Sequence, residues 1–258
     1  MRAYRVASQY ALLALARNRL AMILLIGFIP LWITLTQVLI TRQPLVFRQH
    51  AAGDLLHAGS EKVAMISGSL NAVALLMGFM MFSAAHHSSQ FDRRLVAAGY
   101  PRVALLLAKL TALCVAAIVV STYATLWMLV EWSANQPLLL ACGVLAGALV
   151  YGTIGLFLAL FLPGELEGMV AIIMTSVIDL VPQNPLTSAA SDSALVQLLP
   201  SYGAMQTCLS AGFGDSVAWS PLTGSLAWTG VMALVALAAF TVRTRGHLPI
   251  PTTVGSAA

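Results

Sequence analysis

The stretch FDRRLVAAGYPRVALLLAKL, residues 91–110, interrupts the long apolar runs that make up most of the chain. It joins a charged group at Asp92-Arg93-Arg94 to a Gly-Tyr-Pro sequence at 99–101, after which a new apolar run begins. Glycine followed closely by proline predicts a turn. We therefore expect one membrane span to end near His86, a short charged helix to follow, and the next span to begin near Val103.

Composition makes lipid the expected solvent of this chain. Hydrophobic residues make up 59% and charged residues 9% of the 258 residues, whereas soluble domains average about 45–50% and about 25%. A chain this apolar cannot keep its surface polar, and its length has room for about six spans of about 20 residues. The basic residues lie mainly near the ends of the apolar runs, which indicates membrane orientation rather than nucleic-acid binding.

Six apolar runs have the composition of membrane spans. They cover residues 20–40, 63–85, 103–130, 138–162, 168–181 and 222–242. The fifth run, about 14 residues or about 21 Å as a helix, is short of a hydrocarbon core of roughly 30 Å. We expect it to recruit Glu165–Glu167 or to be completed by re-entrant structure. The sequence thus predicts an all-α integral membrane protein, with six transmembrane helices within residues 20–245.

The N-terminal residues 1–19 alternate arginines with apolar residues in a way that gives a helix one basic and one apolar face. Such a helix is expected to lie flat at the cytoplasmic membrane interface. Further basic residues gather in the loop 86–104 and at 243–245. Because cytoplasmic segments carry an excess of lysine and arginine, we expect both termini in the cytoplasm, with residues 246–258 as a cytoplasmic tail.

This orientation also assigns the remaining loops. Residues 163–168 form a second cytoplasmic loop, and residues 182–221 lie on the outer side. Parts of the outer loop are apolar enough to enter the outer leaflet, so we expect a re-entrant loop that packs over the spans. The excess of arginine over lysine and the abundance of alanine suggest a GC-rich bacterial genome, which points to the bacterial inner membrane.

Motifs for hydrolytic chemistry are missing from the sequence. It contains neither a Gly-x-x-x-x-Gly-Lys-Ser/Thr phosphate loop nor a His-Glu-x-x-His metal motif. Ser67 and Ser69 could suggest an intramembrane serine protease, but the last span has no histidine to act as base. His86 and His87 are adjacent on a helix and therefore point apart. We expect no enzymatic activity, no metal site and no cofactor in this chain.

Charged and polar residues within the spans are few. Lys109 and Asp179 lie near span ends, where they are expected to extend to the interface, and this argues against an ion-driven pump. The uncharged polar residues are open to two interpretations. They either form hydrogen bonds between helices, worth about 1 kcal/mol each at most, or line a mildly polar path for an amphipathic substrate, beside a wall of adaptable methionines.

Two loops carry a resemblance to a known family. Asp92-Arg93-Arg94, then Ala97-Ala98-Gly99-Tyr100-Pro101-Arg102, then Leu105-Leu106-Leu107-Ala108-Lys109-Leu110 resemble the first cytoplasmic loop of type-two ABC exporter permeases. Pro163-Gly164-Glu165-Leu166-Glu167-Gly168 resembles the second cytoplasmic loop of that family. The resemblance extends over essentially the whole chain in its order of spans, but only these two loops are specific.

The resemblance implies a half-transporter that lacks its own ATPase domain. Such a permease pairs with a second permease, identical or similar, and binds a separate ABC ATPase subunit that holds ATP and Mg²⁺. Residues 91–100 would form a coupling helix seated in the ATPase, braced by residues 165–168, and residues 4–18 a connecting helix. The implied coupling residues are Phe91, Asp92, Arg93, Arg94, Gly99, Tyr100, Arg102, Glu165 and Glu167. For Arg93 and Arg94 the alternative is a role in membrane orientation alone.

The family's substrate pathway runs along the dimer seam, formed largely by spans two and five. The residues of this chain that would line it are Ser67, Asn71, Met77, Phe79, Met80, Met174 and Thr175. The expected activity is export of a hydrophobic or amphipathic compound, such as a drug, antibiotic, peptide or lipid. The alternative is a membrane-embedded ligand sensor or immunity component without net transport.

Overall fold

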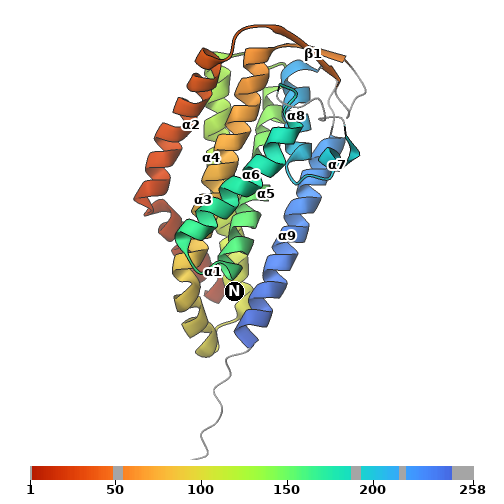
Figure 1. The fold of residues 1–258 in the computed structure, drawn as a ribbon. Coiled ribbons are helices and arrows are strands. Elements are labelled where there is room, and N and C mark those ends of the chain that lie inside the picture. The colour runs from red at the N-terminus through yellow and green to blue at the C-terminus, as the bar shows by residue number, and fades with distance from the viewer. Residues whose placement is uncertain (1, 49–54, 187–192, 215–218, 246–258) are drawn as a thin grey trace, which may run out of the picture.

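The computed structural model is an elongated helical bundle and describes residues 2–48, 55–186, 193–214 and 219–245 (Figure 1). Its elements, in chain order, are α1 Arg2–Ala16, α2 Arg19–Leu39, β1 Pro44–Arg48, β2 Leu55–Gly59, α3 Ser60–Ala97, α4 Arg102–Glu131, α5 Pro137–Phe161, α6 Glu165–Gln183, α7 Ala194–Gln197, α8 Tyr202–Phe213 and α9 Ser220–Arg245. The prediction of an all-α fold is confirmed, apart from one short β-hairpin.

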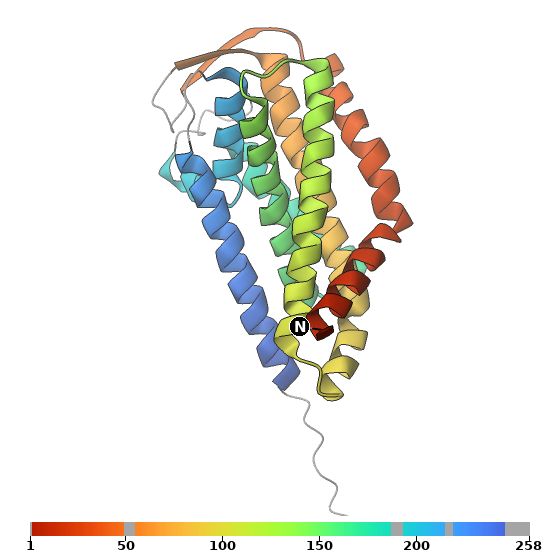
Figure 2. The ribbon, with the colours of Figure 1, turned by 180° about the vertical axis from the view of Figure 1, so that it is seen from behind.

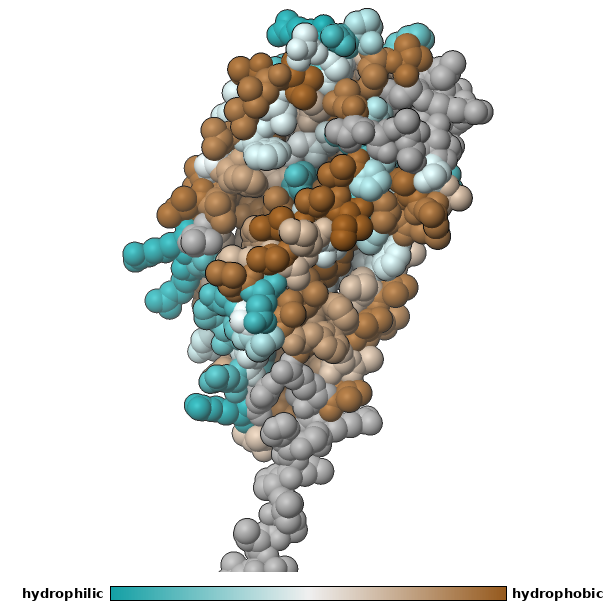
Figure 3. Space-filling model, viewed as in Figure 1, coloured by the Kyte–Doolittle hydropathy of each residue, from teal (hydrophilic) through white to brown (hydrophobic). Residues whose placement is uncertain are grey.

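Among the described residues, 5 helices are long and apolar enough to cross a membrane, namely α2, α3, α4, α5 and α9. Figure 3 shows hydrophobic side chains over most of the visible face between the ends of the bundle, with hydrophilic ones gathered toward the ends. The chain therefore has the composition of a multi-pass membrane protein. The fifth expected span, α6, is not among these helices. It carries Glu165, Glu167 and Asp179 within its 19 residues, so a sixth span stays a prediction.

The centre of the bundle is the pair α3 and α5, which contact most of the other helices. Small residues allow the two helices to approach closely. A Cβ atom added at Gly155 of α5 would overlap the backbone carbonyl oxygen of Gly78 in α3. A Cβ at Gly168 of α6 would overlap the ring of Phe82. Glycine therefore sets the spacing between the central helices and positions α6 across α3.

The bundle has two distinct ends (Figures 1 and 2). One end, the α1 end, holds α1, the connection between α3 and α4, and the end of α9. The other, the hairpin end, holds β1 and β2. The helix α1 and residues 86–104, two of the segments that the sequence places in the cytoplasm, thus lie at the same end of the molecule.

The hairpin is a feature that the sequence analysis did not predict. β1 and β2 pair antiparallel, with Pro44 opposite Gly59 and Arg48 opposite Leu55. The Ser60 hydroxyl fixes its base: it donates to the carbonyl of Thr41 at 2.6 Å and accepts from the Gln43 N–H at 3.0 Å. These two hydrogen bonds hold the base of the hairpin that connects α2 to α3.

The expected outer loop 182–221 contains a buried helix. α8 packs between α5 and α9, and its residues from Gly203 to Gly212 are buried. The helix begins against α9, where the Ser225 hydroxyl accepts a hydrogen bond from the Ala204 N–H at 2.9 Å. α8 thus packs against α5 and α9, and the re-entrant insertion of the loop into the outer leaflet stays a prediction.

Candidate functional site

The residues of the first charged loop belong to a longer helix than expected. α3 continues unbroken from Ser60 to Ala97, so the separate short helix predicted after His86 is wrong. Residues 86–97 contain neither glycine nor proline, so the end of the apolar run is not a signal to end the helix. The helix ends at Ala97, two residues before Gly99, which has a φ of +88°. The predicted Gly-Tyr-Pro turn is therefore present, and α4 begins directly after it at Arg102.

Asp92 points into the protein rather than toward a partner. It is only 5% exposed, and its Oδ2 forms an ion pair with the ammonium group of Lys109 in α4. The Ser88 hydroxyl donates to the same oxygen at 3.2 Å and accepts from Lys109 at 2.9 Å. A direct docking role for Asp92 is thus wrong, as is the expectation that Lys109 extends to the interface. Both charges are instead paired within the bundle, because an unpaired buried charge is costly.

Other predicted coupling residues face outward. Phe91 is 63% exposed, and Arg94 and Gly99 are exposed as well. Tyr100 and Arg102 are half-buried at the turn. Arg93 lies on α3 between these residues, and its side chain is outside the described part of the structure. The end of α3 therefore presents an aromatic ring and a cation on its outer surface, while Asp92 faces the core.

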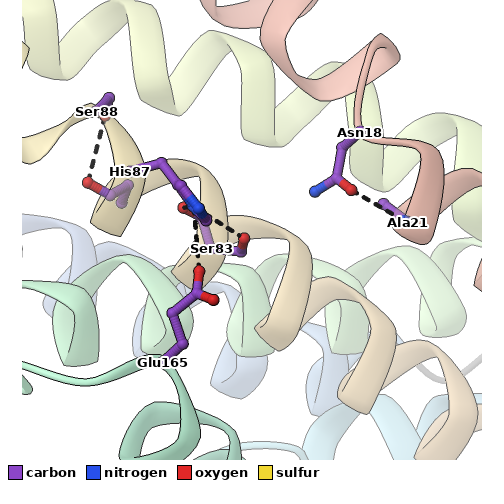
Figure 4. A network of polar contacts seen from close by, with 7 residues as sticks. Asn18, Ala21, Ser83, His87, Ser88 and Glu165 are labelled. Atoms are coloured by element: carbon purple, nitrogen blue, oxygen red, sulfur yellow. Dashed lines mark hydrogen bonds and ion pairs between the residues drawn. The ribbon is translucent and has the colours of Figure 1, made fainter.

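The second charged loop contacts this extension of α3 (Figure 4). Oε1 of Glu165, the first residue of α6, lies 3.2 Å from Nδ1 of His87. His87 Nδ1 also lies 2.9 Å from the backbone carbonyl of Ser83 one turn earlier. The structure thus places the start of the second loop against α3 at His87, shortly before the first segment of the family resemblance begins at Asp92. His87 is a contact that the sequence analysis missed, because nothing in its local pattern points to a partner so distant in sequence.

α1 lies against the same end of the bundle, where it packs mainly on α4. The Tyr4 hydroxyl and the Thr111 hydroxyl form a hydrogen bond of 2.6 Å. Asn18 accepts a hydrogen bond from the Ala21 N–H and caps the start of α2. Tyr10 and Leu13 of α1 remain exposed. A helix with one packed face and one exposed apolar surface is compatible with the predicted interfacial position.

The predicted substrate-path residues do not form one surface. Met77 and Met80 are buried in the core, whereas Met174 is exposed on α6. Phe79 is half-buried and packs against the core. Because Met77 and Met80 are enclosed by neighbouring helices, they cannot line an open path in this conformation. Their assignment to the pathway is therefore not supported by the single chain.

Two of the three polar members of that set, Ser67 and Thr175, form hydrogen bonds with the protein itself. The Thr175 hydroxyl donates to the carbonyl of Ala171 at 2.8 Å. The Ser67 hydroxyl accepts a bond of 3.2 Å from the Asn184 amide. Asn71 is half-buried on the same helix. The simpler interpretation, hydrogen bonding within and between helices, thus accounts for Ser67 and Thr175.

A second polar cluster lies inside the bundle around Asp179. This residue is 2% exposed and does not reach the interface as expected. The Tyr151 hydroxyl donates to Oδ2 at 2.8 Å, and the Gln183 amide donates to Oδ1 at 2.7 Å. The backbone N–H of Ser201 adds a longer contact of 3.4 Å to Oδ1. The cluster connects α5 and α6 to the chain just before α8.

A scan against models of protein families and a search of curated proteins both find no match for this chain. The likeness to type-two permeases thus depends on the loop residues given above.

Proposed function

We propose that this chain is the permease subunit of a type-two ABC exporter of the bacterial inner membrane. It would move a hydrophobic or amphipathic compound out of the cell, driven by ATP hydrolysis on a separate ATPase subunit. The observation that supports this most strongly is the continuity of α3. The helix that carries the exposed Phe91 and Arg94 is also the helix at the centre of the bundle.

The helix α3 is long enough to transmit movement from outside the membrane to the centre of the bundle. Its 38 residues correspond to roughly 57 Å of helix, against a hydrocarbon core of roughly 30 Å. A large part of the helix therefore projects beyond the membrane at the α1 end. Because there is no break between the projecting part and the part in the core, a displacement of one moves the other. A partner that pushes on the projection would act directly on the helix in contact with α5.

Contacts on two sides hold the projection in place. Lys109 of α4 is paired with Asp92, and Glu165 of α6 contacts His87. Movement of the projection would therefore carry α4 and α6 with it. In this interpretation Asp92 and Glu165 are positioning residues, and the outward residues form the docking surface. An exposed aromatic ring beside an arginine is a composition enriched at protein interfaces.

The remaining parts of the proposal concern assembly. A half-transporter needs a second permease, identical or similar, to enclose a pathway. α6 exposes a row of apolar side chains at Ile173, Met174, Val177 and Ile178, and this row would be covered by the second permease. The path would then form between two chains, which explains why the single chain does not expose it.

Affinity purification tests the proposal directly. The tagged chain would be expressed with its chromosomal neighbours, extracted in mild detergent and measured by native mass spectrometry. We expect two permease chains with two ATPase chains, together with an ATPase activity that depends on the permease. Recovery of the chain without an ATPase, and without ATP-dependent activity, would overturn the proposal and favour a ligand sensor.

A further inference from the structure

A cavity of about 390 Å³ lies between α1, α3 and α4 at the α1 end. Alanines explain why it is there. α1 places Ala7, Ala11 and Ala14 on the wall, at spacings of three and four residues that put them on one face of a helix. α4 contributes Ala108 and Ala112 in the same way. Side chains this small leave the space between the helices unfilled.

The cavity also explains the packing of α1, which contacts α4 extensively but touches α3 little. The volume lies within the range of about 300–1,000 Å³ typical of small-molecule pockets. Protein interiors are close-packed, and an empty apolar space of this size forfeits packing contacts along its whole lining. A ligand that filled it would connect α1 to the projecting part of α3.

The wall of the cavity is mostly apolar, and its charged groups lie at one place, where Ser88, Asp92 and Lys109 line it. Tyr10 and Tyr100 also line the cavity with aromatic rings that carry hydroxyls. Asp92 and Lys109 already neutralise each other. A ligand with a charged head would have to separate this pair and leave one buried charge without a partner. An uncharged head that donates or accepts hydrogen bonds meets no such penalty, since it can bind the hydroxyl, the ammonium or the carboxylate of the intact cluster.

We propose that this cavity binds a neutral amphiphile with one apolar chain and an uncharged hydrogen-bonding head. The chain lies along the alanine faces of α1 and α4, and the head contacts the cluster of Ser88, Asp92 and Lys109. Two sources have this chemistry, a single-chain membrane lipid such as a monoacylglycerol and a nonionic compound from outside the cell. The site is contained in one chain, so it does not depend on the proposed transport activity.

Photolabelling of the full-length chain tests this site. The chain would be placed in vesicles of phosphatidylcholine and phosphatidylglycerol and illuminated with a monoacylglycerol that carries a diazirine on its acyl chain. We expect labels on peptides that contain Tyr10 and Met81, two residues of the wall. Unlabelled monoacylglycerol should remove the labels, whereas a fatty acid and a single-chain quaternary ammonium of equal length should not.

Two cavity-filling variants and one matched control make the test specific. Ala14→Phe and Ala84→Phe place a ring in the cavity and should each lower the labelling about tenfold, the equivalent of about 1.4 kcal/mol of binding. Ala16→Phe adds the same ring at a position of α1 that does not line the cavity and should leave the labelling unchanged. The two cavity-filling variants lie on different helices, so the test still works if one of them does not fold. Size-exclusion chromatography identifies a variant that does not fold.

The outcomes distinguish a membrane lipid from a compound that comes from outside the cell, and they also show whether the proposal fails. A neutral lipid that remains on the chain after detergent-free extraction, and is lost in Ala14→Phe, identifies a membrane lipid. Extraction without such a lipid, combined with competable labelling, identifies an outside compound. Labelling that is equal in Ala14→Phe and Ala16→Phe, or equal competition by the charged amphiphiles, would overturn the proposal.

Discussion

Nδ1 of His87 in α3 lies 3.2 Å from Oε1 of Glu165, the first residue of α6. The two side chains are 67% and 45% exposed, so a contact between them is worth only about 0–1 kcal/mol. The contact matters because of where it lies. It joins the projecting end of α3 to the start of the helix that crosses the bundle beside it. A weak contact at this position can set the relative movement of two helices without contributing much stability.

Replacing either member of this contact should impair coupling rather than folding. His87→Ala and Glu165→Gln should each lower permease-dependent ATPase activity by up to about fivefold, since about 1 kcal/mol corresponds to that factor. The double variant should be no worse than either single one, because both act through one contact. Glu131→Gln, at an exposed acid in the last turn of α4, serves as the control. Additive losses in the double variant would contradict a shared role.

Charge reversal on the docking surface should release the partner. Arg94→Glu changes an exposed side chain, and it should reduce the amount of co-purified ATPase about tenfold while membrane insertion stays normal. Arg17→Glu reverses an exposed arginine after α1 and is the matched control. An ATPase that remains bound at full stoichiometry to Arg94→Glu would contradict the assignment of this surface.

Removing one charge of the Asp92–Lys109 pair should destabilise the protein more than removing both charges. Asp92→Asn or Lys109→Met leaves one charge buried without its partner, which costs about 3–5 kcal/mol. The double variant Asp92→Asn with Lys109→Met removes both charges and should regain most of the loss. Thermal unfolding of the four proteins in the same detergent gives the comparison. A double variant as unstable as the worse single variant would show that the pair is not the cause.

Close approach of α3 and α5 should depend on Gly155. Gly155→Ala forces a methyl group against the backbone of Gly78, which neither helix can relieve by a side-chain rotation. We expect a loss of about 1–3 kcal/mol, as for overpacked cores, measured as a lower unfolding temperature. Gly230→Ala, where an added methyl group meets open space, should have little effect. Equal stability of the two variants would argue against this contact.

The cluster around Asp179 gives a further stability prediction. Tyr151→Phe removes a buried donor to the carboxylate and should lower stability by about 1–3 kcal/mol. Tyr123→Phe also removes a hydroxyl, but one whose bond to the carbonyl of Ile26 is at the exposed surface, so its effect should be smaller. Both variants can be compared by thermal unfolding, and the reverse order of stability would be inconsistent with a buried cluster.

The features that the sequence predicted well are those with local signals. Apolar runs identified α2, α3, α4, α5 and α9 as helices of membrane-spanning composition. The Gly-Tyr-Pro sequence identified the turn at Gly99, because a positive φ and a missing N–H are properties of single residues. Basic residues at 1–19 indicated the amphipathic α1, which the structure places at the same end as the charged loop.

The features that the sequence did not reveal depend on pairing across the fold. Nothing near Asp92 shows that Lys109 will face it, and nothing near Asp179 shows that Tyr151 will. The end of the apolar run near His86 predicts the end of a helix, but α3 continues to Ala97 because polar residues continue a helix as readily as apolar ones. The sequence does not reveal the hairpin of β1 and β2, because its strands are only 5 residues each. In strands this short, the alternation of apolar and polar residues cannot be distinguished from the pattern of a loop.

The burial of α8 also has a consequence for how the protein is made. This helix of 12 residues is flanked in sequence by α5 and α6 on one side and α9 on the other, and it packs against both α5 and α9. Ribosomes release α8 before α9, so for a time the buried residues of α8 lack α9, one of the two helices that they contact most. Biosynthesis is therefore complete only when the last helix has been inserted, and a chain cut short before residue 220 would expose α8 to quality-control proteases.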